Sequence, residues 1–173
     1  MSQVYNANPT VYAPVKSAKA APLWLVDAQD DDNDDNDSPE PIDAEEIFDL
    51  IRSISDPEHP NSLEELRVVS MPQISIAGNR IHVEFTPTVP HCGMSTLIGL
   101  SIRVRLLRAL PSRFKIDITL KPGSHQSELA VNKQLNDKER VAAALENPAL
   151  VQTVETTLAN AYRRGRPADD DDD

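Results

Sequence analysis

Regular spacing of apolar residues is confined to the middle of this 173-residue chain, and this confinement limits the fold more than any other feature. Residues 1–41 contain an aspartate-rich run at 30–37, and the last five residues, 169–173, are all aspartate. Such segments repel themselves and bury no apolar surface. The sequence therefore predicts one folded domain over residues 42–160, between a disordered acidic N-terminal region, 1–41, and a disordered acidic tail, 161–173.

The net charge of −11 belongs mainly to these two ends. Residues 1–41 hold two lysines against eight acidic residues, and residues 161–173 hold three arginines against five aspartates, which leaves −3 for the predicted domain. Arg103, Arg105 and Arg108 form a local basic cluster, but no basic stripe with interleaved aromatic residues accompanies them. This pattern argues against direct nucleic-acid binding.

Helical and strand patterns alternate inside the predicted domain. Asp43 followed by Glu46 is typical of a helix start, and Ser62 with Glu65 repeats the pattern for a short helical turn. A longer helix is expected from about Ser95, with its core stripe at Leu97, Leu100, Val104 and Leu107. Further helical patterns cover residues 128–134 and 137–145, and Pro148 suits the first turn of a last helix.

Two segments alternate between apolar and polar residues, as strands with one buried face do. They are residues 81–85 and 114–120, and Ala77, Gly78 and Asn79 before the first of them supply a hairpin turn. The order of helix, strands, helix, strand and helices predicts an α+β fold, with a small mixed or antiparallel sheet packed against helices.

The chain has a single cysteine, Cys92, which excludes an intrachain disulfide and any metal site needing three thiolates from one chain. A chain of this kind fits a reducing compartment, so we expect it in the cytoplasm and nucleus. No segment near the N-terminus is typical of a signal peptide or a membrane span.

Cys92 follows a loop rich in proline and threonine and directly precedes a predicted helix, whose positive end favours a thiolate over a thiol. His91 could add a positive neighbour. A lone cysteine can equally be a small buried hydrophobic residue. Asp56, with Pro57 and Glu58, terminates the first helix, and two interpretations stay open: a simple turn, or a loop that packs beside Cys92 and contributes oxygen atoms.

Several segments together closely resemble the eukaryotic cytosolic iron-sulfur assembly component 2 family, also called MMS-nineteen-interacting or Galla proteins. The resemblance covers about residues 42–160, and residues 6–9 resemble the short N-terminal segment of these proteins. The matching segments are Ile47–Ile54, Asp56–Pro60, Phe85–Cys92, Thr96–Ser101 and Val131–Asn147. The resemblance implies a scaffold and carrier in the complex that delivers iron-sulfur clusters to cytosolic and nuclear apo-proteins such as DNA polymerases, helicases and primase.

The same resemblance implies the partners and the site. The partners would be a WD-repeat propeller subunit, a HEAT-repeat subunit, the apo-protein clients and a second copy of the chain in a homodimer. The reactive, cluster-contacting cysteine falls on Cys92, and the supporting residues are His91, Asp56, Glu58, Thr86 and Thr88. Gly93 departs from prokaryotic relatives, which often have proline after the cysteine.

One thiolate cannot hold an iron-sulfur cluster alone, because the usual clusters take four ligands. A transient cluster would need a second Cys92, a cysteine of the propeller subunit or a small cellular thiol. Two alternatives remain from the sequence: an adaptor without cluster contact, and a thiol enzyme. No Gly-x-Ser-x-Gly, phosphate-loop or dinucleotide motif supports catalysis, so we expect a non-catalytic protein.

Overall fold

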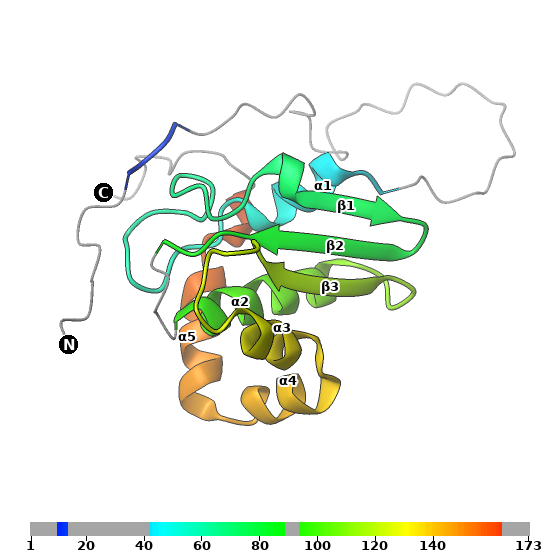
Figure 1. The fold of residues 1–173 in the computed structure, drawn as a ribbon. Helices are drawn as coiled ribbons and strands as arrows, with labels where there is room; N and C mark the ends of the chain where they lie inside the picture. The colour runs from blue at the N-terminus through cyan, green and yellow to red at the C-terminus, as the bar shows by residue number, and fades with distance from the viewer. Residues whose placement is uncertain (1–9, 14–41, 89–93, 164–173) are drawn as a thin grey trace, which may run out of the picture.

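The computed structural model describes residues 10–13, 42–88 and 94–163. Within these ranges it contains five α-helices and a three-stranded sheet, which confirms the predicted α+β class (Figure 1). Most of both predicted acidic tails lies outside the described residues. Two parts of them are described: residues 10–13, and the 3₁₀ helix η3 (Ala161–Arg163), in which Ala161 is buried.

The sheet is mixed. Strands β1 (Ile74–Ala77) and β2 (Arg80–Phe85) form an antiparallel hairpin, and β3 (Lys115–Leu120) pairs with β2 in parallel, in the order β1-β2-β3. Gly78 has φ +60°, the conformation that a two-residue hairpin turn demands. Ile81 pairs with Ile116 across the parallel ladder, so the alternating apolar residues of both strands share one face and enter the core.

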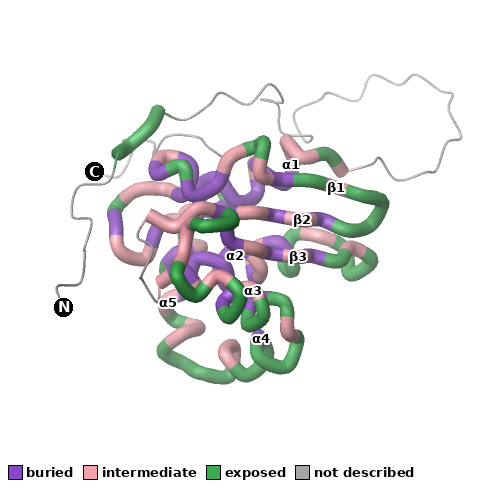
Figure 2. Tube along the Cα trace, in the orientation of Figure 1, coloured by how far each residue is buried: buried purple, intermediate pink, exposed green. Residues whose placement is uncertain are grey.

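Helix α2 (Met94–Ala109) connects the two parallel strands and packs against the sheet and three other helices. These are α1 (Ala44–Ile51), α3 (Glu128–Asn136) and α5 (Pro148–Leu158), and α4 (Lys138–Leu145) bridges α3 and α5. Buried segments concentrate where α1, α2 and the sheet meet, whereas α4 is mostly exposed (Figure 2). Of the described helices, none is both long and apolar enough to cross a bilayer.

The predicted core stripe of α2 is wrong in part. Leu100 and Val104 are buried, but Leu97 is only half-buried and Leu107 is 52% exposed. A single stripe describes a helix with one covered face. Neighbours cover α2 on several sides, so its buried positions also include Ile98, Gly99, Ile102 and Leu106.

Two helices start as predicted. The Asp43 carboxylate accepts from the Glu46 amide at 2.9 Å, and Pro148 begins α5. Ser62 and Glu65 also cap one another: the Glu65 amide donates to Ser62 Oγ, and the Ser62 amide donates to Glu65 Oε2 at 3.0 Å. The predicted short helical turn follows this second box: the Leu66 amide donates to the Ser62 carbonyl at 3.2 Å, and the chain leaves the turn at Arg67, whose φ is 52°.

Side chains of α3 close the free edge of β3. The Asn136 amide group accepts from the Ile118 amide at 2.9 Å and donates to the Ile118 carbonyl at 2.8 Å, and Asn132 Oδ1 accepts from the Leu120 amide. On another side, α3 packs closely on α2, because a Cβ on Gly99 of α2 would lie 2.4 Å from a methyl carbon of Leu135. The helix therefore satisfies edge groups that would otherwise invite pairing with another strand.

The predicted basic cluster on α2 is dispersed in space. Arg103 donates to the Ile116 carbonyl, Arg105 donates to the Leu50 carbonyl, and Arg108 binds Glu155 of α5. Each arginine serves a different contact between elements, so the three do not form one basic surface.

Candidate functional site

The predicted reactive residue, Cys92, lies with His91 in residues 89–93, outside the described residues. The chain is described again from Met94, where α2 begins two residues after Cys92. The predicted helix that follows Cys92 is therefore confirmed. The roles of Cys92 and His91 stay predictions.

The turn after α1 is organised by Asp56. One oxygen of its carboxylate, Oδ1, accepts from the amides of Glu58 at 2.8 Å and His59 at 3.1 Å, while the Asp56 amide donates to the Asn61 carbonyl at 2.9 Å. Pro57 follows Asp56 and cannot continue the helix. The simple turn interpretation is thus correct as far as it goes, because Asp56 is a side-chain cap for its own loop.

Asp56 is nevertheless in an unusual environment for a carboxylate. Asp56 is only 7% exposed. Burial raises the pKa of its carboxyl group above the ordinary value of 3.8, although the hydrogen bonds from the two backbone amides oppose the shift. Desolvation penalises the charged form and hydrogen bonds to it favour that form. Asp56 is therefore a buried carboxyl group whose position is fixed by two backbone amides.

A small cavity of about 10 Å³ lies between this turn and the described residues on either side of segment 89–93, the cysteine segment. That volume is near the minimum for one water molecule. The geometry brings Asp56, Glu58 and Thr88 together, three of the predicted site residues. The full lining is Asp56, Glu58, Pro87, Thr88, Met94, Ser95 and Ile98.

Thr86 does not line this cavity. Its hydroxyl accepts from Gln73 Nε2 at 2.9 Å, and its amide donates to the Val68 carbonyl at 2.8 Å. These contacts anchor the end of β2 to the preceding segment. Thr86 therefore lies next to the site residues in sequence, but its side chain is engaged elsewhere.

The sequence pattern marks Ser95 only as a possible helix start, and the structure gives it a place at the site. Its hydroxyl is buried, lines the cavity, and has no hydrogen-bond partner among the described residues. A serine in the first turn of a helix is too common a signal to identify such a position. Only the approach of the Asp56 turn makes Ser95 notable.

The loop that carries Asp56 is held by a buried ion pair. The Arg52 guanidinium donates to both carboxylate oxygens of Glu64, at 2.9 and 2.6 Å, and to Asp49 at 2.8 Å. Arg52 is only 2% exposed. Burial by itself would lower the pKa of its guanidinium, but the hydrogen bonds and charges of Glu64 and Asp49 together outweigh burial, so the pKa is raised. This bidentate pair ties both ends of the loop to one charged group.

A larger groove of about 450 Å³ also borders the Asp56 turn. Its second wall is helix α5, so Asp56 borders both hollows. Its lining is rich in hydroxyl groups and contains one charged residue. The lining residues are Ser55, Asp56, Pro57, Ala149, Gln152, Thr153, Thr156 and Thr157.

The described residues contain no cluster of three or more histidine, cysteine, aspartate or glutamate residues that could hold a metal ion.

Comparison with known proteins decides the family. A family model described as iron-sulfur cluster assembly protein matches residues 44–130. The chain belongs to this family. It is 53% identical to the MIP18 family protein galla-2 of Drosophila melanogaster over 91% of this chain and 97% of that protein. It is also 53% identical to cytosolic iron-sulfur assembly component 2B of Mus musculus, over 89% of this chain and 90% of that protein.

A plant relative shows a similar likeness: protein AE7 of Arabidopsis thaliana is 54% identical over 91% of this chain and 97% of that protein. These matches confirm the resemblance read from the sequence. The matched region of the family model includes the Asp56 turn, the cysteine segment and all three strands.

Proposed function

We propose that this chain is a non-catalytic scaffold and carrier of the cytosolic iron-sulfur targeting complex, which passes clusters to apo-proteins such as DNA polymerases, helicases and primase. Membership of the iron-sulfur cluster assembly family supports the general role. The observation that carries the specific role is the cavity, where the Asp56 turn meets the two segments that flank Cys92. The cluster is cargo in this proposal.

Cys92 is the proposed cluster ligand. The chain has no second cysteine, and clusters usually take four ligands. The other ligands would come from Cys92 of a second copy in a homodimer, from a cysteine of the WD-repeat propeller subunit, or from a small thiol. Incomplete ligation suits a carrier, since a cluster enclosed by four ligands of one protein is harder to release.

Asp56, Glu58, Thr88 and His91 are the proposed supporting residues, with Thr86 anchoring the strand that leads to them. The Asp56 turn supplies oxygen atoms at the cavity wall, held in place by backbone hydrogen bonds. It contains no thiolate that would compete with Cys92 for the cluster. A HEAT-repeat subunit and the apo-protein clients would complete the assembly, in the cytoplasm and the nucleus. Contact with nucleic acid or a membrane forms no part of the proposal.

The deciding experiment compares wild type with Cys92→Ser and Cys92→Ala. Anaerobic reconstitution, with and without the propeller subunit, is followed by absorption and electron paramagnetic resonance. Serine keeps the size and polarity of the side chain but is a poor ligand for iron-sulfur clusters. We expect both variants to fold and keep their protein partners, and to lose cluster signal and client maturation.

Ser127→Ala is a matched control, because Ser127 lies before α3, in a loop away from the cavity lining. It should reconstitute like wild type. Full client maturation by either Cys92 variant would overturn the carrier role and favour an adaptor without cluster contact. Substrate turnover that disappears with Cys92 would instead reveal a thiol enzyme.

A further inference from the structure

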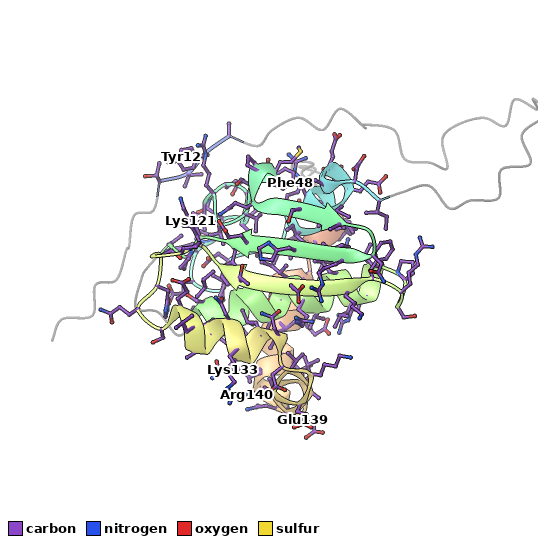
Figure 3. All side chains as sticks on the ribbon, turned by 45° about the vertical axis from the view of Figure 1, so that its right-hand side comes forward. Tyr12, Phe48, Lys121, Lys133, Glu139 and Arg140 are labelled. Carbon is purple, nitrogen blue, oxygen red and sulfur yellow. The ribbon has the colours of Figure 1, made fainter. Side chains whose placement is uncertain are left out.

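A short piece of the N-terminal region, residues 10–13, lies on the folded domain. The Tyr12 amide donates to the Glu65 carbonyl at 2.6 Å, and the Arg67 guanidinium carbon lies 3.9 Å from the centre of the Tyr12 ring. Tyr12 stands at the upper left of Figure 3, on the opposite side of the molecule from α4. These residues fall within the region for which composition predicts no structure, so the contact calls for a reason.

The residue that meets the Tyr12 ring has an uncommon backbone. Arg67, at φ 52°, is the one non-glycine residue with positive φ among those that the structure describes. A side chain with a Cβ is disfavoured there, and such residues concentrate at clamps and binding sites, where surrounding contacts hold them. The stacked tyrosine ring is a contact of this kind.

The clamped turn leads to the candidate site through a short relay of hydrogen bonds. Tyr12 binds the backbone of Glu65, and the Glu65 carboxylate accepts from Asn61 Nδ2 at 3.1 Å and from the Ser62 amide at 3.0 Å. The Asn61 carbonyl in turn accepts from the Asp56 amide at 2.9 Å. Any loosening at residues 65–67 is thus passed to the turn that forms the cavity wall.

We propose that residues 10–13 are a strap that docks on the 61–67 turn and positions the Asp56 turn, with Tyr12 as its positioning residue. One backbone hydrogen bond and one cation–π contact are weak individually, so the strap binds reversibly. The 28-residue segment 14–41 keeps it tethered near its dock. The proposal concerns the shape of the site and does not depend on cluster transfer.

The test measures amide hydrogen exchange in the full chain for wild type, Tyr12→Ala, Tyr12→Phe and Tyr162→Ala. Tyr162 is a matched control, since it is 69% exposed and also stacks near an arginine, Arg163, but at 6.0 Å. We expect Tyr12→Ala to speed exchange over residues 54–67 by about two- to fivefold, the factor that a surface cation–π contact can supply. Tyr12→Phe keeps the ring and should restore the wild-type rate.

Strand β3 serves as an internal reference, because it is an edge strand whose described hydrogen bonds run to β2 and to side chains of α3 and not to residues 61–67. Its exchange should be equal in all four proteins. Unchanged exchange over 54–67 in Tyr12→Ala would refute the strap, as would an equal increase in β3, which would indicate general destabilisation. A response to Tyr162→Ala as large as that to Tyr12→Ala would likewise overturn it.

Discussion

Two regions of the molecule are held by hydrogen bonds from polar side chains, yet these side chains differ in charge. On the α3 side, neutral amide groups of Asn132 and Asn136 complete the edge of β3, and Leu135 packs tightly over Gly99. In the site loop, residues 52–67, a buried arginine binds two carboxylates. The first region is held by neutral amide groups and apolar packing. The second is held by Arg52 and its two carboxylate partners, called here the charged frame.

The difference indicates what each region is for. Neutral packing and satisfied edge groups add stability with little desolvation cost. Buried charges cost desolvation energy that their partners must offset, so they are weak evidence for stability but define geometry closely. The charged frame surrounds the turn that carries Asp56, which is where a precise position matters for the proposed site.

The largest expected effect comes from breaking the charged frame. Arg52→Ala should reduce the free energy of unfolding by about 3–5 kcal/mol, because it leaves the Glu64 carboxylate buried without its arginine. Chemical denaturation followed by circular dichroism measures the change.

The control for this prediction is the double variant Arg52→Met, Glu64→Leu, which removes both charges and retains apolar volume. It should recover much of the lost stability. A loss below about 1 kcal/mol for Arg52→Ala would show that the frame is not buried in solution as the structure has it.

A smaller effect is expected on the neutral side. Asn136→Ala should cost about 1–3 kcal/mol, because the amide and carbonyl of Ile118 both lose their partner at a partly covered edge. Gln134→Ala, on an exposed position of the same helix, is the matched control and should be nearly neutral. Equal losses for the two variants, measured by denaturation, would contradict the edge-closing role of Asn136.

The pH dependence of stability tests the Asp56 turn more finely. The pKa of Asp56 is raised in the folded state, so this carboxyl holds its proton more tightly when folded. Its contribution is most favourable at low pH and declines as pH rises from about 3.8 through the higher folded pKa. Asp56→Asn keeps an oxygen acceptor and cannot ionise.

The expected result is that Asp56→Asn gains stability relative to wild type as pH rises through that window, measured by thermal unfolding at a series of pH values. Asp137→Asn is the comparison, since Asp137 also caps backbone amides but its side chain is 38% exposed. A stability difference between wild type and Asp56→Asn that does not vary with pH would disprove the burial effect.

The smallest effect is expected for an exposed ion pair, which sharpens the contrast with Arg52. Arg108 and Glu155 join α2 to α5, but their side chains are 55% and 49% exposed. The hydrogen bond from Arg108 lowers the pKa of Glu155 below its ordinary value of 4.5, so the pair contributes fully above that ordinary value and loses its effect as pH falls through the lower folded pKa. Solvent and salt screen it, and Glu155→Gln should leave the denaturation midpoint at neutral pH unchanged.

The sequence by itself determined the local elements and the family. The Asp43 cap, the hairpin at Gly78 and the buried faces of β2 and β3 follow from spacing, because each depends on residues close together in the chain. The family resemblance likewise depends on contiguous motifs, and the family match confirmed it.

Tertiary structure alone decided how these pieces meet. Spacing could not show that β3 runs parallel to β2, that α2 is covered on several sides, or that Arg52 is buried against Glu64. It also left two interpretations of Asp56 open, and the structure places this turn against the start of α2, beside Ser95. Such contacts join segments distant in the chain, and their free energy depends on burial and on partners that no local pattern contains.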